Sequence, residues 1–433
     1  MESCQESNYS FYIDPGSYTF KCASIPHMMP GKQPAFKICE IPSFLSDSTH
    51  IENQKNIDEL IKQKYTYANS TIEGKSFKPF KYGSFNSPDG IGNLLEASMM
   101  ILNFHAKRSL DTDVIFPEFI KQQPNEVQEM HSVINEILFE EFNASSIMYT
   151  NTPFLSLISE GMDKGSVLEL GQSHSLYTII KQGATSYQHT SFFKINGRKI
   201  DRQLFNILNC YNYNLSRNAI IDSTANRYVI SSLKNNADIS TDLWRVNSSL
   251  PDGSSIQYNK ELLRQPMFLY FDTYNSTFLE KKMFANYENE KSRLQRHIGS
   301  VMYSDDPIKE DDKIEGLRSL SQEILESKQR HNRLNIMEFI VKAIINYSKQ
   351  ADIDFTSLNE ILMTGGMSQY IYSEIEHRKV EEGGVLGSIS FKKQKWTTQG
   401  SCLNNYFGAT VLNNLSSWKE KATTKKSYEE FGK

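Results

Sequence analysis

The feature that most constrains the fold is a strand-turn-strand unit that the chain uses twice. Residues 11–22 (FYIDPGSYTFKC) combine an apolar strand that ends in Asp14, a turn that contains Gly, and a second strand. Residues 166–181 (SVLELGQSHSLYTIIK) repeat this order, with Glu169 near the end of the first strand and Gly171 in the turn. Gly, Pro and Ser favour such turns because they accept the backbone angles of a tight reversal. No short-period repeat accompanies the unit, so a solenoid is not expected.

Two acidic hairpins are suited to holding the phosphate tail of a nucleotide from both sides. Backbone N–H groups at the Gly turns can donate to phosphate oxygens, and carboxylates such as Asp14 and Glu169 can organise Mg2+ through water. A single turn of this kind is more often structural than functional. The functional interpretation therefore depends on the order of the remaining segments.

The segments around the hairpins show helical and strand periodicity. Residues 92–105 and 125–142 carry apolar side chains three and four positions apart, which predicts two amphipathic helices. Between them, residues 113–116 form a short apolar run that is typical of a buried strand. A further strand is predicted over 146–149, and a helix over 153–159.

The composition is that of a globular protein. Of the 433 residues, 39% are apolar and 23% are charged, which excludes the disordered and membrane-embedded classes. A net charge of -4 provides no overall positive field, so any contact with nucleic acid would be indirect. The acidic N-terminus and the absence of an 18-residue apolar run predict no secretion and no direct membrane contact. We expect reduced thiols, because the chain has no CxxC pair and its cysteines are scattered, at Cys4, Cys22, Cys39, Cys210 and Cys402.

Two segments differ in composition from the rest. Residues 46–78 are polar and predict a variable surface loop. Residues 281–333 combine an acidic cluster with apolar side chains at helical spacing, which predicts an amphipathic helix. This helix either packs on its own domain or binds a partner, and both interpretations stay open.

Seven segments, taken in order, resemble the actin family. The hairpins FYIDPGSYTFKCA and GSVLELGQSHSLYTIIKQG look like the family's two phosphate hairpins. The segment between them resembles the family's stretch that leads into and along the helix below the nucleotide; it reads VINEILFEEFNASSIMYTNTPFLSLISEG. Four more matches follow in family order: NGRKIDRQLFNIL, SLPDGSSIQ, EILMTGGM and YFGATVLNNLSSWKEKATTKKSYEEFG. The matches run from residue 11 to 432, and their collinear order is specific where a single match is not.

The resemblance implies that the chain binds ATP or ADP with Mg2+. The first-hairpin contacts would be Asp14, Gly16, Ser17 and Lys21. The second-hairpin contacts would be Glu169, Gly171, Gln172 and Ser173. The adenosine side would use Lys234, Gly365, Gly366 and Met367. Asp14 and Glu169 would hold the metal through water.

Four positions depart from the family pattern. Glu169 stands where the family has an aspartate, and Gln172 replaces a carboxylate. The family's water-orienting glutamine falls on Thr152, and the histidine near that water falls on Leu176. Because positioning an attacking water is most of what a phosphohydrolase achieves, we assign no catalytic residue and expect little hydrolysis. His174 lies two residues from Leu176 on the same strand face; it is either a displaced replacement or a structural histidine.

The resemblance also implies a fold class. We expect the two-lobed α/β fold shared by actin, hexokinase and the heat-shock ATPases, with the nucleotide cleft between the lobes. The first lobe would comprise residues 1–145 with the loop 46–78. The second would comprise 146–340 with the insertion 281–333, and residues 341–433 would return to the first lobe. Related folds serve many functions, so the fold does not determine the function.

Three functions are compatible with the resemblance. The preferred one is a non-polymerising actin-related protein in the nucleus, a structural subunit of a chromatin-remodelling complex or, next, of a dynactin-type cap. Its partners would be other subunits, an actin or actin-related protein, or an amphipathic helix. The alternative is a cytoplasmic, cytoskeletal actin-like ATPase that polymerises or caps filaments. A kinase would need an aspartate base that we cannot assign. The lack of a recognisable filament loop in residues 46–78 favours the first function.

Overall fold

The structure is a computed structural model, and the residues it describes are 9–16, 19–26, 37–42, 45–46, 76–77, 80–81, 84–85, 88–102, 110–118, 124–181, 184–193, 195–201, 245–249, 255–259, 268–271, 335–348, 359–394, 397–398 and 401–431. Ser17, Lys234, the insertion 281–333 and nearly all of the loop 46–78 lie outside these residues. Their predicted roles therefore stay predictions.

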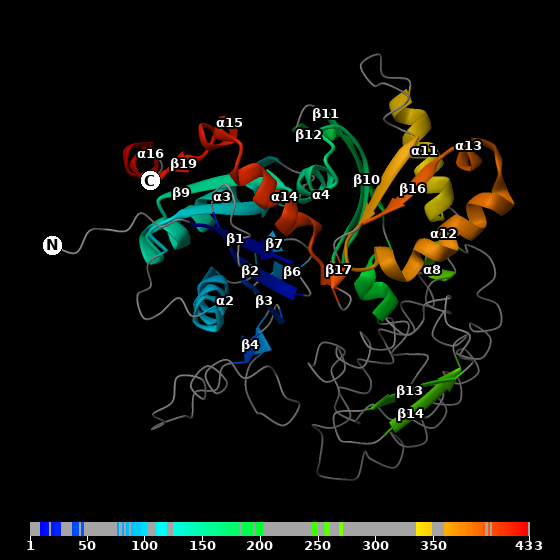
Figure 1. The fold of residues 1–433 in the computed structure, drawn as a ribbon, viewed down its shortest axis with the longest axis horizontal. Helices are drawn as coiled ribbons and strands as arrows, with labels where there is room; N and C mark the ends of the chain where they lie inside the picture. Colours follow the sequence, from blue (N-terminus) through cyan, green and yellow to red (C-terminus); the bar gives the residue numbers. More distant parts are fainter. Residues whose placement is uncertain are drawn as a thin grey trace, which may run out of the picture.

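Six strands form the sheet of the first lobe, in the order β19-β9-β8-β1-β2-β3 (Figure 1). They are β1 (Tyr9–Pro15), β2 (Thr19–Pro26), β3 (Lys37–Pro42), β8 (Asp113–Glu118), β9 (Ser146–Asn151) and β19 (Thr423–Thr424). The first predicted hairpin is β1 and β2, which pair antiparallel, while β1 pairs parallel with β8 on its other side. The hairpin strand β1 therefore lies inside the sheet.

Five strands form the sheet of the second lobe, in the order β12-β11-β10-β15-β16. They are β10 (Gly165–Leu170), β11 (Ser175–Lys181), β12 (Ala184–Phe193), β15 (Glu360–Thr364) and β16 (Ser390–Lys393). Here β10 pairs antiparallel with β11 and parallel with β15, as β1 does with β2 and β8. The duplication seen in the hairpins thus extends to the sheets, and the predicted two-lobed α/β fold is confirmed.

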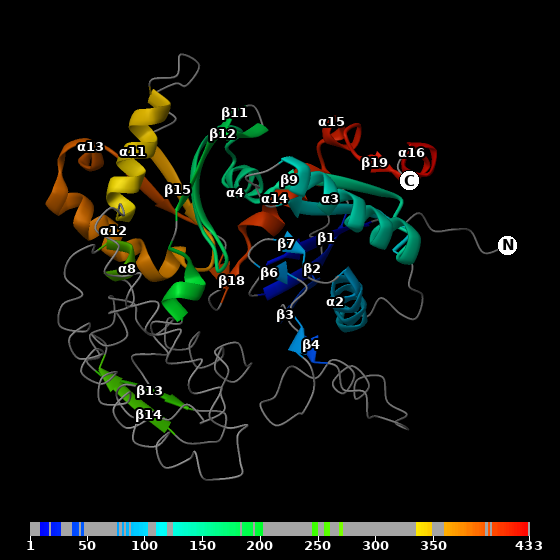
Figure 2. The same ribbon diagram turned by 180° about the vertical axis from the view of Figure 1, so that it is seen from behind.

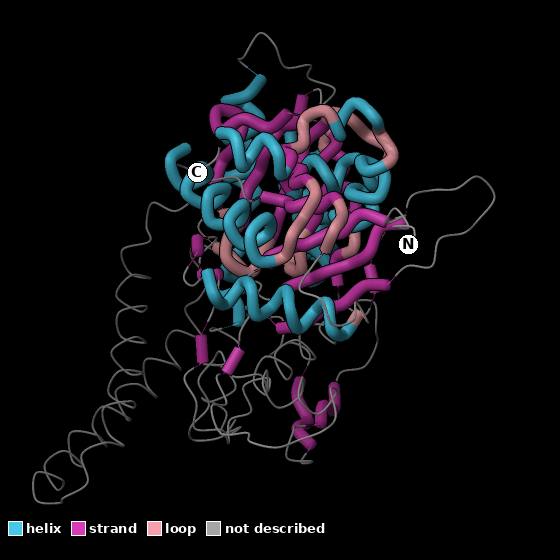
Figure 3. Tube along the Cα trace, turned by 90° about the vertical axis from the view of Figure 1, so that its left-hand side faces the viewer, coloured by secondary structure: helices cyan, strands magenta, loops and turns pink. Residues whose placement is uncertain are grey.

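Helices flank and join the two sheets. They are α2 (Pro88–Ile101), α3 (Pro124–Asn135), α4 (Thr152–Ser159), α8 (Phe268–Phe271), α11 (Ile336–Ser348), α12 (Ser368–Glu382), α13 (Gly384–Gly387), α14 (Asn404–Asn413), α15 (Ser416–Lys419) and α16 (Lys425–Phe431), with a π-helix η1 over Glu136–Glu141. Figures 1 and 2 both place α4 and α14 between the sheets. Figure 3 shows helices in front of the strands of the first lobe, which faces the viewer there. No helix in the described residues is long and apolar enough to cross a membrane.

Four small strand pairs complete the described part of the chain. They are β4 (Leu45–Ser46) with β5 (Ser76–Phe77), β6 (Phe80–Lys81) with β7 (Ser84–Phe85), β13 (Arg245–Ser249) with β14 (Ser255–Asn259), and β17 (Thr397–Thr398) with β18 (Ser401–Cys402). None of them joins either of the two large sheets.

The two lobes share a core around α4 and α14. One cluster of buried side chains combines Tyr12 of the first sheet, Val167 of the second sheet and Tyr406 of α14. The two helices approach very closely, since a Cβ atom built on Gly408 would lie 1.9 Å from the backbone oxygen of Leu155. Only glycine permits this close contact between α14 and α4.

The local predictions hold with shifted limits. The first predicted helix begins four residues early, at Pro88, because proline is tolerated in the first turn of a helix. The second ends as an α-helix at Asn135 and continues as the π-helix η1.

Cys22 and Cys39, as predicted, are free thiols; they lie opposite each other in β2 and β3. Burial raises the pKa of the Cys22 thiol.

The predicted limits of the lobes are wrong at two places. The strand over residues 146–151 was expected to open the second lobe, but it pairs with β8 in the first sheet, so the first lobe extends past residue 145. Residues 341–433 were expected to return to the first lobe, but β15 and β16 pair within the second sheet. Parallel neighbours need a long crossover, so a strand distant in sequence can belong to the same sheet. After β16, the chain returns to the first sheet at β19.

Candidate functional site

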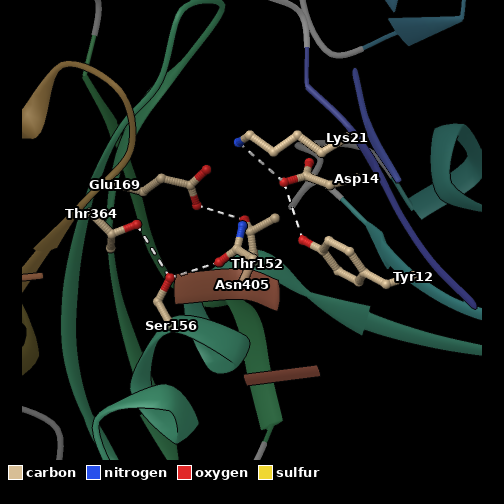
Figure 4. A network of polar contacts seen from close by, with 8 residues as sticks. All are labelled: Tyr12, Asp14, Lys21, Thr152, Ser156, Glu169, Thr364 and Asn405. Carbon is tan, nitrogen blue, oxygen red and sulfur yellow. Dashed lines mark hydrogen bonds and ion pairs between the residues drawn. The ribbon is translucent and has the colours of Figure 1, made fainter. Parts of the chain in front are cut away.

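The two hairpins direct their acidic side chains toward each other. Asp14 lies near the end of β1 and Glu169 near the end of β10, and both residues are buried. Figure 4 shows the two carboxylates on opposite sides of the start of α4, where Thr152 lies. The structure therefore brings together Asp14, Lys21, Glu169 and Thr152 of the predicted site residues.

The first hairpin holds its carboxylate with a cation. Lys21 lies opposite Asp14 in the strand register, and its Nζ is 3.7 Å from Asp14 Oδ2. Tyr12, which the alternation of β1 places on the same face, donates its hydroxyl to the same oxygen at 3.2 Å. The Tyr12 ring contacts Tyr406 edge-on, and burial raises the pKa of Tyr406 to about 12. We did not predict Tyr12 as a site residue, although its spacing of two from Asp14 was a usable signal.

The second hairpin holds its carboxylate differently. Leu176, not a cation, lies opposite Glu169 in the register, and Leu176 is fully buried. Thr152 donates its hydroxyl to Glu169 Oε2 at 2.7 Å, and His174 Nε2 lies 3.3 Å from Glu169 Oε1. Oε2 of Glu169 therefore accepts a hydrogen bond, whereas Oε1 lies at ion-pair distance from the His174 imidazole without hydrogen-bond geometry.

The start of α4 explains the position of Thr152. The Asn151 side chain accepts a hydrogen bond from the backbone N–H of Phe154 at 2.9 Å and caps the helix, while Pro153 fits its first turn. Thr152 thus lies where β9 turns into α4, next to the end of β10. The longer Glu169 reaches the shorter Thr152, so the two departures from the family pattern fit each other.

A short helix over residues 197–201 covers the turn of the second hairpin. The backbone N–H groups of Gly197 and Arg198 donate to the carbonyls of Gly171 and Gln172, and Asn196 Nδ2 donates to the Ser173 carbonyl at 2.6 Å. The Gln172 side chain donates to the buried Asp201 at 2.5 Å. Gln172 is therefore engaged with this helix and not with Asp14 or Glu169.

The Gly-Gly loop after β15 lies beside the same hairpin. Gly365 has φ +89°, and a Cβ built on it would lie 2.5 Å from the Leu170 carbonyl oxygen. The Met367 N–H donates to that oxygen at 3.0 Å, and the Met367 side chain is buried in the core of the second lobe. Gly366 is exposed, with nothing within 4 Å of a Cβ built on it. The backbone at Gly366 is thus the part of this loop open to a ligand.

Polar contacts connect α4, β15 and α14 beneath the two carboxylates. The Ser156 hydroxyl lies 3.2 Å from that of Thr364 and donates to Asn405 Oδ1 at 2.8 Å. Figure 4 shows Ser156 below Thr152 and Glu169, joined by dashed lines to Thr364 on one side and Asn405 on the other. Sequence reasoning missed this network, because Ser156 is more than 200 residues from both of its partners.

The predicted metal position fits Mg2+ poorly on the second hairpin. Within the described residues, no group of three His, Cys, Asp or Glu side chains could hold a metal. Of the two predicted ligands, Glu169 already contacts Thr152 and His174. Mg2+ demands near-octahedral oxygen geometry, to which a carboxylate fixed on both sides adapts poorly.

Comparison with known proteins identifies the family. The family model of actin matches residues 5–242, more than half of the chain. The chain belongs to the actin family. A curated relative, "Putative actin-29" of Dictyostelium discoideum, is 27% identical over 181 residues, which cover 38% of this chain and 46% of the relative. The match thus spans about half of that relative's length. Within the actin family this chain is divergent, with Thr152, Leu176, Glu169 and Gln172 at the positions named above.

Proposed function

We propose that this actin-family chain is a non-polymerising, actin-related structural subunit that binds ATP or ADP and hydrolyses it very slowly. One observation carries the proposal: the two side chains at the positions of the family's water-orienting pair are engaged in contacts within the protein. Thr152 donates to Glu169, and Leu176 is fully buried opposite Glu169. Neither can hold a water in line with a phosphate, which is the main requirement of phosphoryl hydrolysis.

Nucleotide binding is supported by the first hairpin. Asp14 and Lys21 form an ion pair at the strand end, and Lys21 extends from β2 toward the space between the two acidic side chains (Figure 4). A lysine ammonium is a common phosphate ligand, and the backbone at Gly16 and Gly366 adds small residues that a ligand can approach closely. The nucleotide would thus serve as a conformational ligand that contacts both lobes.

The role as a complex subunit is supported by the divergence of the chain. A protein that keeps the two-lobed fold but loses the water-orienting pair retains a ligand-dependent shape without turnover. We place this subunit in the nucleus, in a chromatin-remodelling complex first and a dynactin-type cap next. The amphipathic helix predicted within residues 281–333 is a candidate contact with other subunits.

The test combines binding, hydrolysis and assembly on the purified chain. We expect ATP to bind, phosphate release to stay near background, and the protein to remain in the supernatant on sedimentation with Mg2+, ATP and salt. The variant Thr152→Gln/Leu176→His should raise phosphate release about tenfold, since a positioned proton acceptor contributes that much or more. Hydrolysis or filament formation by the unmodified chain would favour the cytoskeletal ATPase instead.

A further inference from the structure

The contacts of Glu169 assign a role to His174. The two oxygens of this carboxylate face different elements: Oε2 accepts from Thr152 at the start of α4, and Oε1 lies 3.3 Å from His174 Nε2 in the hairpin turn. The Glu169 and His174 side chains are only 10% and 19% exposed, so water competes little for the contact. We infer that His174 is a positioning residue that, with Thr152, holds Glu169 within its own lobe, so that a nucleotide polyphosphate binds here with little dependence on Mg2+. This inference rests on the proposed nucleotide binding.

The hairpin turn fixes His174 in place. The backbone N–H of Gly171 donates to the His174 carbonyl at 2.9 Å, which closes the turn. A Cβ built on Gly171 would lie 2.9 Å from that same carbonyl oxygen, so only glycine allows the chain to reverse this tightly. The backbone of His174 is thus placed beside Glu169 by a tight turn.

The geometry leaves the second carboxylate poorly suited to a metal. A carboxylate offers about four acceptor positions in two oxygens, and the rotation of the group decides where they point. The hydrogen bond from Thr152 to Oε2 and the His174 imidazole 3.3 Å from Oε1 restrict that rotation. To organise the water shell of Mg2+, Glu169 would have to give up Thr152 or His174, because the metal tolerates little distortion of its octahedron.

The first hairpin supplies the positive charge that the phosphates need. Lys21 Nζ lies 3.7 Å from Asp14 Oδ2, and Tyr12 contacts that same oxygen, so both contacts of Asp14 fall on one side of its carboxylate. A lysine ammonium neutralises phosphate as a compact point charge. Lys21 can therefore balance a polyphosphate where the family uses a metal held from both hairpins.

The experiment is equilibrium binding of ATP to the full chain, once with Mg2+ and once with a chelator. We expect the chelator to weaken binding less than about threefold in the unmodified chain, and about tenfold or more in His174→Val, where Oε1 is released for the metal's water shell. The matched control is His189→Val, since His189 in β12 contacts the Tyr347 ring, away from both carboxylates. It should behave like the unmodified chain.

Three outcomes overturn the inference. A tenfold or larger loss on chelation in the unmodified chain, or a His174→Val variant that matches it, would overturn the role of His174 while leaving nucleotide binding intact. Binding of ATP under neither condition would overturn the proposed function and the inference together. A measurement without nucleotide tests the contact itself: the unfolding effects of His174→Val and Glu169→Gln should be non-additive in the double variant, and additivity would refute the contact.

Discussion

The two acidic hairpins of this chain have the same topology, but their carboxylates are held by different kinds of contact. In each, the first strand pairs antiparallel with the second and parallel with a later strand. In the first hairpin the residue opposite Asp14 is Lys21, which forms an ion pair with it. In the second the residue opposite Glu169 is the buried Leu176; Thr152 donates a hydrogen bond to the acid, and His174 Nε2 lies 3.3 Å from its other oxygen.

Two hairpins with the same backbone topology can therefore differ in the contacts of their acidic side chains. A cross-strand partner is fixed by register, so the Asp14 pair follows from the hairpin alone. The partners of Glu169 come from another helix and from the turn, so they depend on how α4 packs against β10. The first hairpin carries an ion pair suited to phosphate, and the second carries an acid that contacts residues outside its own two strands.

Forcing apart the helices α4 and α14, which lie between the two sheets, should have the largest effect. Gly408→Val places side-chain atoms where a Cβ alone would lie 1.9 Å from the Leu155 carbonyl oxygen, so α4 and α14 must move apart. We expect a loss of at least about 3 kcal/mol in the free energy of unfolding, measured by urea denaturation. Gly387→Val is the control, because nothing lies within 4 Å of a Cβ there. Equal losses in both variants would mean that the close helix contact does not form.

Removing the cation of the first hairpin should have the next largest effect. Lys21→Met should weaken ATP binding by about 2 kcal/mol, roughly 30-fold, because a charge-assisted contact to phosphate is lost. Binding can be followed by calorimetry. Lys181→Met, at the far end of β11 in the second hairpin, should leave the affinity unchanged. If Lys21→Met binds normally, the phosphate contact does not lie on the first hairpin.

Restoring a carboxylate to the turn of the second hairpin should destabilise the chain. Gln172→Asp replaces an amide donor with an acid facing the buried Asp201, so two like charges meet. We expect a cost of about 1–2 kcal/mol in unfolding free energy at neutral pH. Adding Asp201→Asn supplies a donor again and should recover most of the loss. A Gln172→Asp variant as stable as the original would show that the Gln172–Asp201 contact is absent.

The smallest predicted effect comes from removing one tyrosine hydroxyl in each hairpin and comparing the two variants. Tyr12→Phe removes the hydroxyl that contacts Asp14, and Tyr177→Phe removes the one that donates to Ser166 at 3.0 Å in the second hairpin. Each should cost about 1 kcal/mol in unfolding free energy. Only Tyr12→Phe should also weaken ATP binding, by about threefold, because only Asp14 belongs to the cation-bearing hairpin. Equal effects on binding would remove the distinction between the hairpins.

The hairpins, their acidic ends and the family could be predicted from the sequence alone. Apolar alternation, turn residues and collinear motifs are local in the chain, so they can be read without knowing what packs against them. Sequence also predicted that Thr152 and Leu176 occupy the positions of the water-orienting pair. It placed the lobe limits wrongly, since strand order within a parallel sheet depends on long crossovers.

The contacts of the site residues could not be predicted from the sequence, because they depend on how the elements pack. The bond from Thr152 to Glu169, the approach of His174 to the same acid and the engagement of Gln172 with Asp201 each join different elements. Such contacts depend on the packing of α4, the turn and the helix over 197–201 to within an ångström. A hydrogen bond is lost over a few tenths of an ångström beyond its normal range, so no pattern of residue types can specify which acid a hydroxyl will reach.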